Sequence, residues 1–538
     1  MSEHEVDLVV VGTGAAGCAA ALAGAAHGLR VVLLEKSERL GGATAGSLGG
    51  FWAPCNHLMA AAGLDDSLDA ARRYMAFLSG GYALAPMTEA YLRAAPLALA
   101  DFALAGVGLR LMRNLPDHYF PQGPGATADG RMVETLPIAR AAIAPWGDRL
   151  EEGVYNEPGV SWGDAIAWGG LGARQRWPEA ELQARIAGGL LAAGAGLIGQ
   201  FLAQLMTRGV TILAGFRADR LLMEAGRVTG LEGTHDGTSM RLHARAGVVL
   251  ATGGYEGSPD LVNRFEGLPD WMNIFPRSIE GDGMVMGSEL GAAVWRVPNN
   301  LAMLVGYAIP AADGGEQFFS AGLRGLSYPH SIVVNDQARR FCDESQFQHA
   351  VSALTRFDLG QHRHPNLPAW MLFDAQYFRR YSFARRPPGA PIPDWVVQAD
   401  SVAALAARIG VDAGTLDASI AQFNRGAAQG EDAAFGRGTS AFARSTAGDP
   451  HAAHPNLGTL EEAPFCAVRI KLGGISAAGL LTDPDARVLH VRGQPIAGLY
   501  ACGNAAAPTE SGAGYQAGVS LMRGAAFGWL ASRHAAGA

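Results

Sequence analysis

Three glycines near the start of the chain have the spacing of a phosphate-binding turn. The motif Gly12-Thr-Gly14-Ala-Ala-Gly17 follows an apolar run, residues 6–11, that is typical of a strand buried on both faces. In such a turn the first glycine permits a tight bend, the second admits a pyrophosphate, and the third lets the next helix pack closely. The start of that helix attracts phosphate through its unpaired N–H groups. Glu35, at the end of a second apolar run, would accept hydrogen bonds from ribose hydroxyls. The segment predicts a bound dinucleotide.

Further glycine-rich loops indicate which dinucleotide binds. NAD needs only the first motif, whereas this chain adds Gly41-Gly42, Thr252-Gly253-Gly254 and Gly503-Asn504. These additions resemble flavoprotein signatures, so we predict FAD, with the C-terminal loop near the isoalloxazine and no separate NAD(P)H domain. The loop 41–50 has no histidine for covalent attachment, so FAD should be non-covalent. The predicted FAD contacts are Gly12, Gly14, Ala15, Ala16, Gly17, Glu35, Lys36, Gly41, Gly42, Thr44, Ser47, Gly49, Gly50, Thr252, Gly253, Gly254, Asp282, Gly503, Asn504, Gly518, Ser520 and Leu521.

The elements that must position these loops alternate between strands and helices, which predicts an α/β fold with a Rossmann-type FAD-binding domain. Residues 65–210 have a mostly helical pattern. From about 275 the chain becomes richer in Trp, Pro and His, and the α/β alternation resumes after about 455. We therefore expect a discontinuous FAD-binding domain, 1–275 and 456–538, with an inserted α+β catalytic or capping domain at 276–455.

Composition excludes several other classes of protein. Of 538 residues, 49% are hydrophobic and only 17% are charged, which excludes disorder and coiled coil as the main theme. The net charge of −8 with no basic run argues against a nucleic-acid partner, and five scattered cysteines give no metal site. The uncharged stretch 187–207 is rich in Gly and Ala and contains two glutamines, so we predict a buried helix and at most peripheral membrane contact. With no signal-peptide pattern, a cytoplasmic location is expected.

Several segments in chain order carry a family resemblance. They are GTGAAG, GGATAGSLGGFWAPCN, ATGGYE, Gly281-Asp-Gly283, SIVVNDQARRFCDES, FGRG, LLTDPDARVL and IAGLYACGN. Together they resemble the FAD-dependent fumarate reductase and 3-ketosteroid dehydrogenase superfamily over nearly the full length. The 3-ketosteroid Δ1-dehydrogenase branch is the most similar, because of Trp52-Ala-Pro54 after the glycine loop and HYFPQGPG at 118–125.

Charged substrate groups of fumarate reductases are missing from the matching positions. The resemblance places a catalytic arginine eight residues after Arg340, where this chain has Gln348. A C-terminal substrate arginine falls on Tyr515, and a histidine falls on Ile470. Dicarboxylates are held by charged, bidentate donors. The absence of such charged groups at these three positions argues against fumarate reduction.

The ketosteroid branch instead implies a ketone site. Tyr515 and Gly518 match the tyrosine hydroxyl and glycine N–H that hold the substrate's ketone oxygen, and Tyr119 matches a helper tyrosine. The branch's base tyrosine is absent, because Phe347 and Gln348 occupy its place. The candidate bases are therefore Tyr119 first, Tyr328 second, and then His330 or His349. Trp52, Phe120 and Phe347 are predicted walls of the substrate pocket.

The resemblance implies dehydrogenation of a cyclic ketone between its α and β carbons, with a 3-ketosteroid-like molecule as the first candidate. A proton leaves the α carbon to a base and a hydride leaves the β carbon to FAD, while donors stabilise the enolate oxygen. A cyclohexanone-type ketone or another ring bond is one alternative. Reduction of an activated C=C, and flavin binding without catalysis, are the others. An external quinone or similar carrier would accept the electrons.

Overall fold

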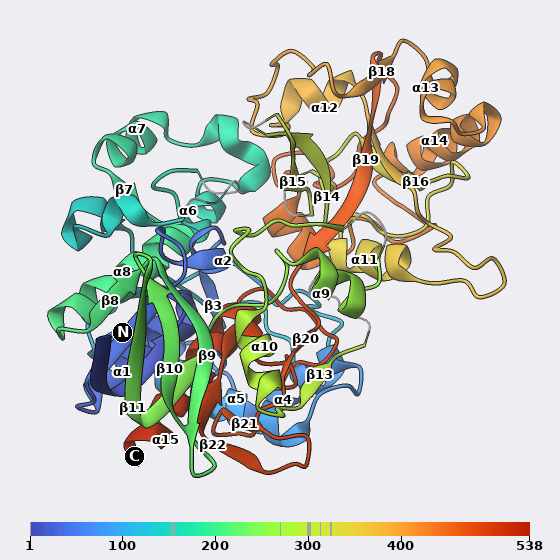
Figure 1. The fold of residues 1–538 in the computed structure, drawn as a ribbon. Helices are drawn as coiled ribbons and strands as arrows, with labels where there is room; N and C mark the ends of the chain where they lie inside the picture. Colours follow the sequence, from blue (N-terminus) through green and yellow to red (C-terminus); the bar gives the residue numbers. More distant parts are fainter. Residues whose placement is uncertain are drawn as a thin grey trace.

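The computed structural model describes residues 2–151, 153, 157–268, 271–298, 303–311, 314–322 and 325–538. Two sheets divide these residues into two regions that lie side by side (Figure 1). We call them the Rossmann region and the cap region. The first sheet, in the Rossmann region, contains β1 (Ser2–Val11), β2 (Val31–Glu35), β8 (Thr211–Ala214), β9 (Phe216–Glu224), β10 (Arg227–His235), β11 (Thr238–Leu250), β21 (Arg487–Leu489) and β22 (Pro495–Ala501).

The centre of the Rossmann sheet is parallel, as the apolar runs predict. Strand β1 pairs in parallel with β2 and β11, and β11 continues in parallel to β22. Val9 and Val10 point to opposite faces of β1 and both are fully buried, because helices and further strands cover the sheet on each side. Helices α1 (Ala15–Ala26) and α15 (Val519–Ala536) pack on each other over one face, so the two ends of the chain share one core.

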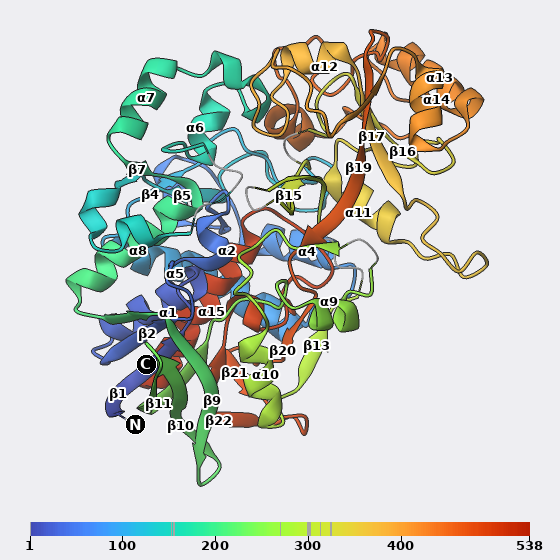
Figure 2. The same cartoon turned by 45° about the horizontal axis from the view of Figure 1, so that its top comes forward.

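The cap region is a second sheet flanked by helices. Its strands run in the order β15-β14-β19-β17-β16, and β12 and β18 also pair with β19. Figures 1 and 2 show β19 running from the cap region toward the Rossmann region. The elements are β12 (Trp271–Met272), β14 (Met303–Pro310), β15 (Glu316–Ser320), β16 (Ser331–Asn335), β17 (Ala369–Phe373), β18 (Val397–Ala399), β19 (Phe465–Gly474), α11 (Phe347–Thr355), α12 (Ala375–Arg380), α13 (Val402–Ile409) and α14 (Ala413–Ala427).

The packing in the structure does not follow the two expected borders, at about 275 and 455, between the FAD-binding domain and the inserted domain. Residues 456–474 were assigned to the FAD-binding part, whereas Leu457 and Leu460 join a core cluster of the cap region and β19 is the central strand of its sheet. In the other direction, α10 (Asp282–Glu289) packs on β9 and on β20 (Ala478–Leu480), although it lies after residue 275. A change of composition near 275 and 455 therefore does not coincide with the change of packing partner.

A helical layer completes the Rossmann region. It contains α2 (Gly42–Ala45), α4 (Leu68–Ser79), α5 (Ala85–Leu104), α6 (Trp162–Ala167), α7 (Glu179–Ala187) and α8 (Ala193–Thr207), with the short sheet β3 (Gly50–Trp52), β4 (Leu109–Leu111) and β5 (Met132–Thr135). Of the uncharged stretch 187–207, residues 193–207 form α8, which is mostly buried as predicted, whereas Leu190–Leu191 form the short strand β7. Among the described residues, no helix has the length and apolar character needed to cross a membrane.

A second G-x-G-x-x-G run exists within α8, at residues 194–199. It lies inside a helix instead of between a strand and a helix. A Cβ atom on Gly194 would overlap the carbonyl oxygen of Thr44, so this glycine permits close packing of α8 on α2. The spacing alone therefore does not mark a second nucleotide site here.

Candidate functional site

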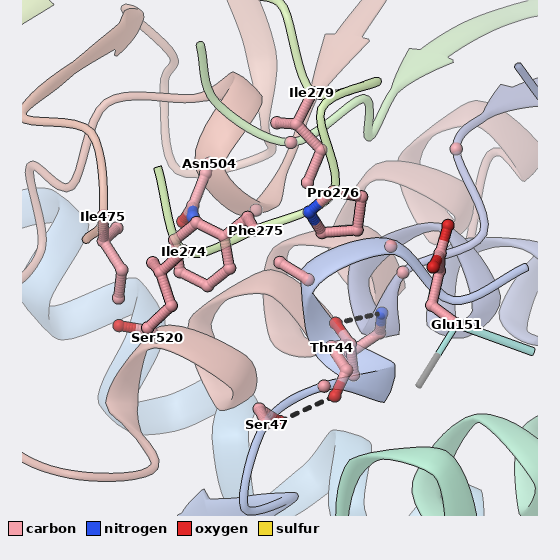
Figure 3. A pocket seen from close by; sticks show the side chains of 18 of the residues that line it. Thr44, Ser47, Glu151, Ile274, Phe275, Pro276, Ile279, Ile475, Asn504 and Ser520 are labelled. Carbon is pink, nitrogen blue, oxygen red and sulfur yellow. Dashed lines mark hydrogen bonds between the residues drawn. The ribbon is translucent and has the colours of Figure 1, made fainter. Parts of the chain in front are cut away.

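A cavity of about 820 Å³ lies between the Rossmann and cap regions. The G-x-G-x-x-G turn, α2 and the start of α15 line one side of it, and residues of β14, β15 and the segment 271–279 line the other. Figure 3 shows Thr44 and Ser47 on the α2 side and Ile274, Phe275 and Pro276 on the segment after β12. Residues of both regions thus form the cavity wall.

The turn after β1 has the geometry that the motif predicts. Gly12 has a φ of +108°, a left-handed conformation, and a Cβ atom there would overlap the carbonyl oxygen of Ala251. A Cβ atom on Gly17 would overlap the carbonyl of Gly12, which shows how closely α1 packs on the turn. Helix α1 begins at Ala15, and its N-terminus faces the cavity. Phosphate oxygens would meet backbone N–H groups there.

Glu35 is held in place by the same turn. Its carboxylate accepts hydrogen bonds from the Thr13 hydroxyl at 2.6 Å, the Thr13 N–H at 3.2 Å and the Ser37 N–H at 3.0 Å. The Gly41 N–H in turn donates to the Thr13 hydroxyl at 2.8 Å. Thr13 therefore connects the first turn, the end of β2 and the second glycine loop, which explains why these distant loops meet at one end of the cavity.

Two predicted cofactor residues form an ion pair across the cavity wall. The Lys36 ammonium donates to Asp282 at 2.6 Å and to Glu280 at 2.8 Å. Lys36 follows β2, whereas Asp282 begins α10. The hydrogen bond from Lys36 keeps the pKa of Glu280 below its usual range. The pair joins two segments that are 244 residues or more apart.

Most of the predicted FAD contacts line this one cavity. Gly17, Gly41 and Gly254 do not, and they act beside it: Gly17 in helix packing, Gly41 through Thr13, and Gly254 where a Cβ atom would overlap the Ser476 hydroxyl. The lining residues among the predicted contacts are Gly12, Gly14, Ala15, Ala16, Glu35, Lys36, Gly42, Thr44, Ser47, Gly49, Gly50, Thr252, Gly253, Asp282, Gly503, Asn504, Gly518, Ser520 and Leu521.

These residues fit a bound dinucleotide. The cavity wall supplies a backbone cradle at Gly12 and Gly14, a helix N-terminus, and an acidic side chain oriented at the end of β2. The Thr252 hydroxyl is buried and has no hydrogen-bond partner among the described residues. Buried polar groups are normally satisfied, so an orphan beside a cavity is consistent with a ligand that completes it. No cluster of His, Cys, Asp or Glu suited to a metal ion occurs in the part of the chain that the structure describes.

Tyr515 and Gly518 lie together on the cavity wall, just before α15. Gly518 has a φ of +84°, and a Cβ atom there would overlap the backbone of Phe51 and Trp52 in β3. Burial raises the pKa of the Tyr515 hydroxyl to about 12, so it remains a neutral donor near pH 7. The arrangement brings a hydroxyl donor next to the residues that would surround the flavin.

The remaining predicted tyrosines lie outside the cavity wall. Tyr119 is partly buried and packs edge-on against Phe77, with ring centroids 5.4 Å apart, and burial raises its pKa to about 12. Tyr328 is buried in an aromatic cluster of the cap region, next to Tyr377 and Tyr381. Neither residue lines the cavity. The structure therefore does not bring either expected base to the ketone site.

The two candidate histidines are also directed elsewhere. His330 is buried, and its Nδ1 pairs with the carbonyl oxygen of Thr459 at 2.7 Å in the cap region. His349 is on the exposed side of α11. Neither His330 nor His349 lines the cavity, so neither is in position to act as the expected base.

The predicted pocket walls occupy a layer behind the cavity. Trp52 is fully buried, and its indole N–H donates to Asp117 at 2.7 Å. Phe120 is partly buried and does not line the cavity, whereas Phe347 is buried with its ring centroid 5.4 Å from that of Tyr515. The Phe347 ring therefore packs against Tyr515, while Trp52 contacts the other expected ketone-binding residue through its backbone, because its N–H donates to the Gly518 carbonyl oxygen at 3.2 Å.

The walls around the ketone end come from segments that the motifs did not single out. They include Ile274, Phe275 and Pro276 after β12 and Ile475 just after β19, all four labelled in Figure 3. Leu304 of β14 and Phe318 of β15 also line the cavity. These side chains are apolar, and Asn273, Arg277, Glu316 and Gln317 of the same segments add polar groups to the cavity wall. Their segments have no periodicity or motif that would mark them, because each contributes one or two side chains from an irregular or edge position.

Comparison with known proteins agrees with this geometry. The family model for an FAD binding domain matches residues 7–521. A 4-oxocyclohexanecarboxylate 2-dehydrogenase of Sinomonas cyclohexanicum is 35% identical, over 99% of this chain and 93% of the relative. A 3-oxosteroid 1-dehydrogenase of Mycobacterium tuberculosis is 32% identical, over 100% of this chain and 99% of the relative.

A solved structure extends the similarity to the whole fold. The 3-ketosteroid Δ1-dehydrogenase of Sterolibacterium denitrificans, in complex with 1,4-androstadiene-3,17-dione, superposes with a TM-score of 0.87 at 27% identity and covers 99% of both chains. The expected α/β fold and the resemblance that was noted from the motifs are confirmed. The chain belongs to the FAD binding domain family, and its cofactor is FAD.

Proposed function

We propose that this protein is an oxidoreductase that acts on CH–CH groups and desaturates a cyclic ketone. The observation that carries the proposal is the position of Tyr515 and Gly518 on the same cavity wall as the predicted FAD contacts. The curated relatives that match along the whole chain have names that describe dehydrogenation of a cyclic oxo compound, which supports the same class of substrate.

The chemistry requires two groups to leave adjacent carbons. The bound FAD supplies the acceptor for the hydride of the β carbon. The α carbon loses a proton to a general base, and the electron pair of that C–H bond is shared with the ketone oxygen as an enolate until departure of the β hydride completes the new C=C bond. During this step negative charge develops on the ketone oxygen, so preorganised donors at that oxygen lower the barrier. The Tyr515 hydroxyl and the Gly518 N–H would supply them.

Two substrate shapes remain to be distinguished. The apolar wall formed by Phe275, Pro276 and Phe318 favours a hydrophobic ring system, and we propose a 3-ketosteroid-like ketone first. A smaller cyclohexanone-type ketone is the second candidate, because a 35% identical relative carries a name of that kind. We also propose non-covalent FAD, an external quinone-type electron acceptor and a cytoplasmic location.

Anaerobic mixing of the FAD-loaded protein with ketones tests the proposal. The panel contains a 3-ketosteroid, its 5α-saturated analogue, a 4-oxocyclohexanecarboxylate, cyclohexanone and, as a control, succinate. We expect one ketone to bleach the flavin absorbance while an enone band appears, and succinate to have no effect. Reoxidation of pre-reduced protein by an enone, with no bleaching by any ketone, would instead identify a C=C reductase. No reaction in either direction would leave only flavin binding.

A further inference from the structure

His118 is a buried histidine that packs directly against Tyr515. Its ring centroid lies 5.5 Å from that of Tyr515, 3.8 Å from Phe442 and 6.4 Å from Phe347. The His118 backbone N–H donates to the side-chain oxygen of Gln516 at 2.9 Å, which attaches this segment to the residue next to Tyr515. The histidine is thus held beside the expected ketone-binding group from two directions.

Gln348 determines which ring nitrogen of His118 carries the hydrogen. Its side-chain nitrogen lies 2.8 Å from Nδ1 of His118. An amide nitrogen donates and does not accept, so Nδ1 is the acceptor and the neutral ring carries its hydrogen on Nε2. Burial lowers the pKa of His118 to about 3, which keeps the ring neutral near pH 7. Gln348 is itself buried and begins the first turn of α11 with Phe347.

The second nitrogen of His118 is an unused donor. Nε2 is buried and has no hydrogen-bond partner among the described residues. A buried donor without a partner is destabilising, so a structure that retains one needs a reason. The ring that lies nearest and also carries a hydroxyl group is Tyr515, and Tyr515 reaches the cavity whereas His118 does not.

We propose that His118 is a positioning residue for Tyr515, and that its Nε2–H donates to the Tyr515 hydroxyl oxygen when a ketone binds. This inference rests on the proposed function. Hydrogen bonds at active sites are often absent or long before substrate binds and form in the complex. With its oxygen occupied by the histidine, the Tyr515 hydroxyl has its hydrogen directed toward the ketone oxygen, and the chain of donors polarises in one direction.

A neutral imidazole suits this role. A cationic donor would carry its own charge into the apolar site, whereas a neutral N–H can strengthen the phenol as charge develops on the ketone oxygen. Gln348 lies eight residues after Arg340, where the resemblance to fumarate reductases places a catalytic arginine, and it is with Phe347 one of two residues that fall where the ketosteroid branch has its base tyrosine. In this chain the same position supports a histidine instead.

Two measurements on a series of variants test the role. The first is the rate of flavin reduction by the ketone under anaerobic conditions. The second is the carbonyl stretching frequency of a ¹³C-labelled enone bound to the oxidised protein, which reports polarisation of the carbonyl without turnover. The single variants are His118→Phe, His118→Gln, Gln348→Met and Tyr515→Phe. The double variants combine His118→Phe with Gln348→Met and with Tyr515→Phe. His349→Phe is the matched control, because His349 is the exposed neighbour of Gln348 on α11.

His118→Phe should slow flavin reduction about tenfold to thirtyfold, less than direct loss of an oxyanion donor. The carbonyl band should move from the wild-type position toward that of Tyr515→Phe, with FAD retained. In His118→Gln the side-chain amide N–H can take the place of the His118 Nε2–H. This variant should therefore recover part of the flavin-reduction rate and part of the carbonyl band shift. Gln348→Met should slow flavin reduction less than His118→Phe does. The double variant His118→Phe/Gln348→Met should reduce flavin as fast as His118→Phe alone.

The decisive outcome is the combination with Tyr515→Phe. If His118 acts through Tyr515, His118→Phe adds no further loss in that background. An additive loss, or an unchanged carbonyl band in both His118→Gln and His118→Phe, would overturn the inference. Failure of the proposed function would show in the wild type itself, as no bleaching by any ketone, and would overturn both proposals.

Discussion

The two ends of the cavity are built in different ways. At the dinucleotide end, contacts are made mainly by backbone and glycine: the Gly12 turn, the second glycine loop and the start of α1 meet through Thr13 and Glu35. At the ketone end, side chains from distant segments converge, including Tyr515, Phe347 and His118. Backbone cradles tolerate little change, whereas side-chain walls can be replaced one at a time. The cofactor end should therefore respond to mutation as a unit, and the ketone end residue by residue.

Gly12→Ala tests the backbone cradle and should have the largest effect. A Cβ atom there overlaps the Ala251 carbonyl, and the φ of +108° is unfavourable for any L side chain. We expect purified protein that has lost most of its FAD, measured as the ratio of flavin to protein absorbance. Gly28→Ala is the matched control: Gly28 has a φ of +81° but no atom near its missing Cβ, so it carries the strain without the overlap. Full FAD occupancy in Gly12→Ala would contradict the cradle.

Tyr515→Phe tests the opposite end, where one atom is removed without disturbing the cofactor. Loss of one preorganised oxyanion donor typically slows catalysis about 10²–10³-fold. We expect such a decrease in flavin reduction by the ketone, with FAD occupancy unchanged. Tyr500→Phe is the control, because the Tyr500 hydroxyl pairs with His534 at 2.9 Å in the Rossmann region. Wild-type rates in Tyr515→Phe would contradict the enolate role.

The same contrast explains what could be predicted from the sequence. The cradle uses short contiguous motifs whose backbone requirements leave glycines at fixed spacing, so Gly12, Glu35 and the loop partners could be identified before the fold. The ketone wall has no such requirement. Ile475 and Phe275 both line the cavity from separate segments, after β19 and after β12, and the sequence carries no local record of that convergence.

The His118–Gln348 pair shows why the neighbours of Tyr515 could not be located from motif positions alone. The two residues are 230 apart in sequence and come from a loop and from α11. Motif matching drew attention to Tyr119, one residue later, because its neighbours match the family segment. In the folded protein the His118 ring packs against Tyr515, whereas the Tyr119 ring packs against Phe77. The domain borders moved for a similar reason, since β19 joins the cap sheet through strand pairing that composition does not reveal.

Trp52→Phe should affect stability and leave chemistry nearly intact. Trp52 lies behind the cavity, and its N–H donates to Asp117, which also accepts from Arg131 at 2.9 Å. Removal of one buried donor to a charged acceptor should lower the free energy of unfolding by about 1–3 kcal/mol. Thermal unfolding measures that loss, and flavin reduction per bound FAD should be unchanged. A changed ketone affinity with unchanged stability would show that Trp52 touches the substrate after all.

Lys36→Met should have the smallest effect and tests whether the ion pair between the end of β2 and the start of α10 contributes to the cofactor end. Lys36 pairs with Glu280 and Asp282 near the protein surface, where ion pairs contribute little. The pKa of Glu280 is lowered in the folded protein, so the stability that this pair contributes is present at neutral pH and is lost as the pH falls below the usual carboxyl range. Melting temperatures of variant and wild type should therefore differ slightly at pH 7 and converge near the acidic end of the folded range.

The control for Lys36→Met is Arg220→Met. Arg220 pairs with Glu232 at 2.9 Å between β9 and β10, and that hydrogen bond likewise lowers the pKa of Glu232. The control should show the same pH dependence of melting but no change in FAD dissociation, because its pair lies within one sheet. Faster FAD loss in Lys36→Met alone would show that the Lys36 pair helps to close the cavity over the cofactor. Equal FAD loss in both variants would mean that the cradle at Gly12 and Glu35 holds FAD without help from α10.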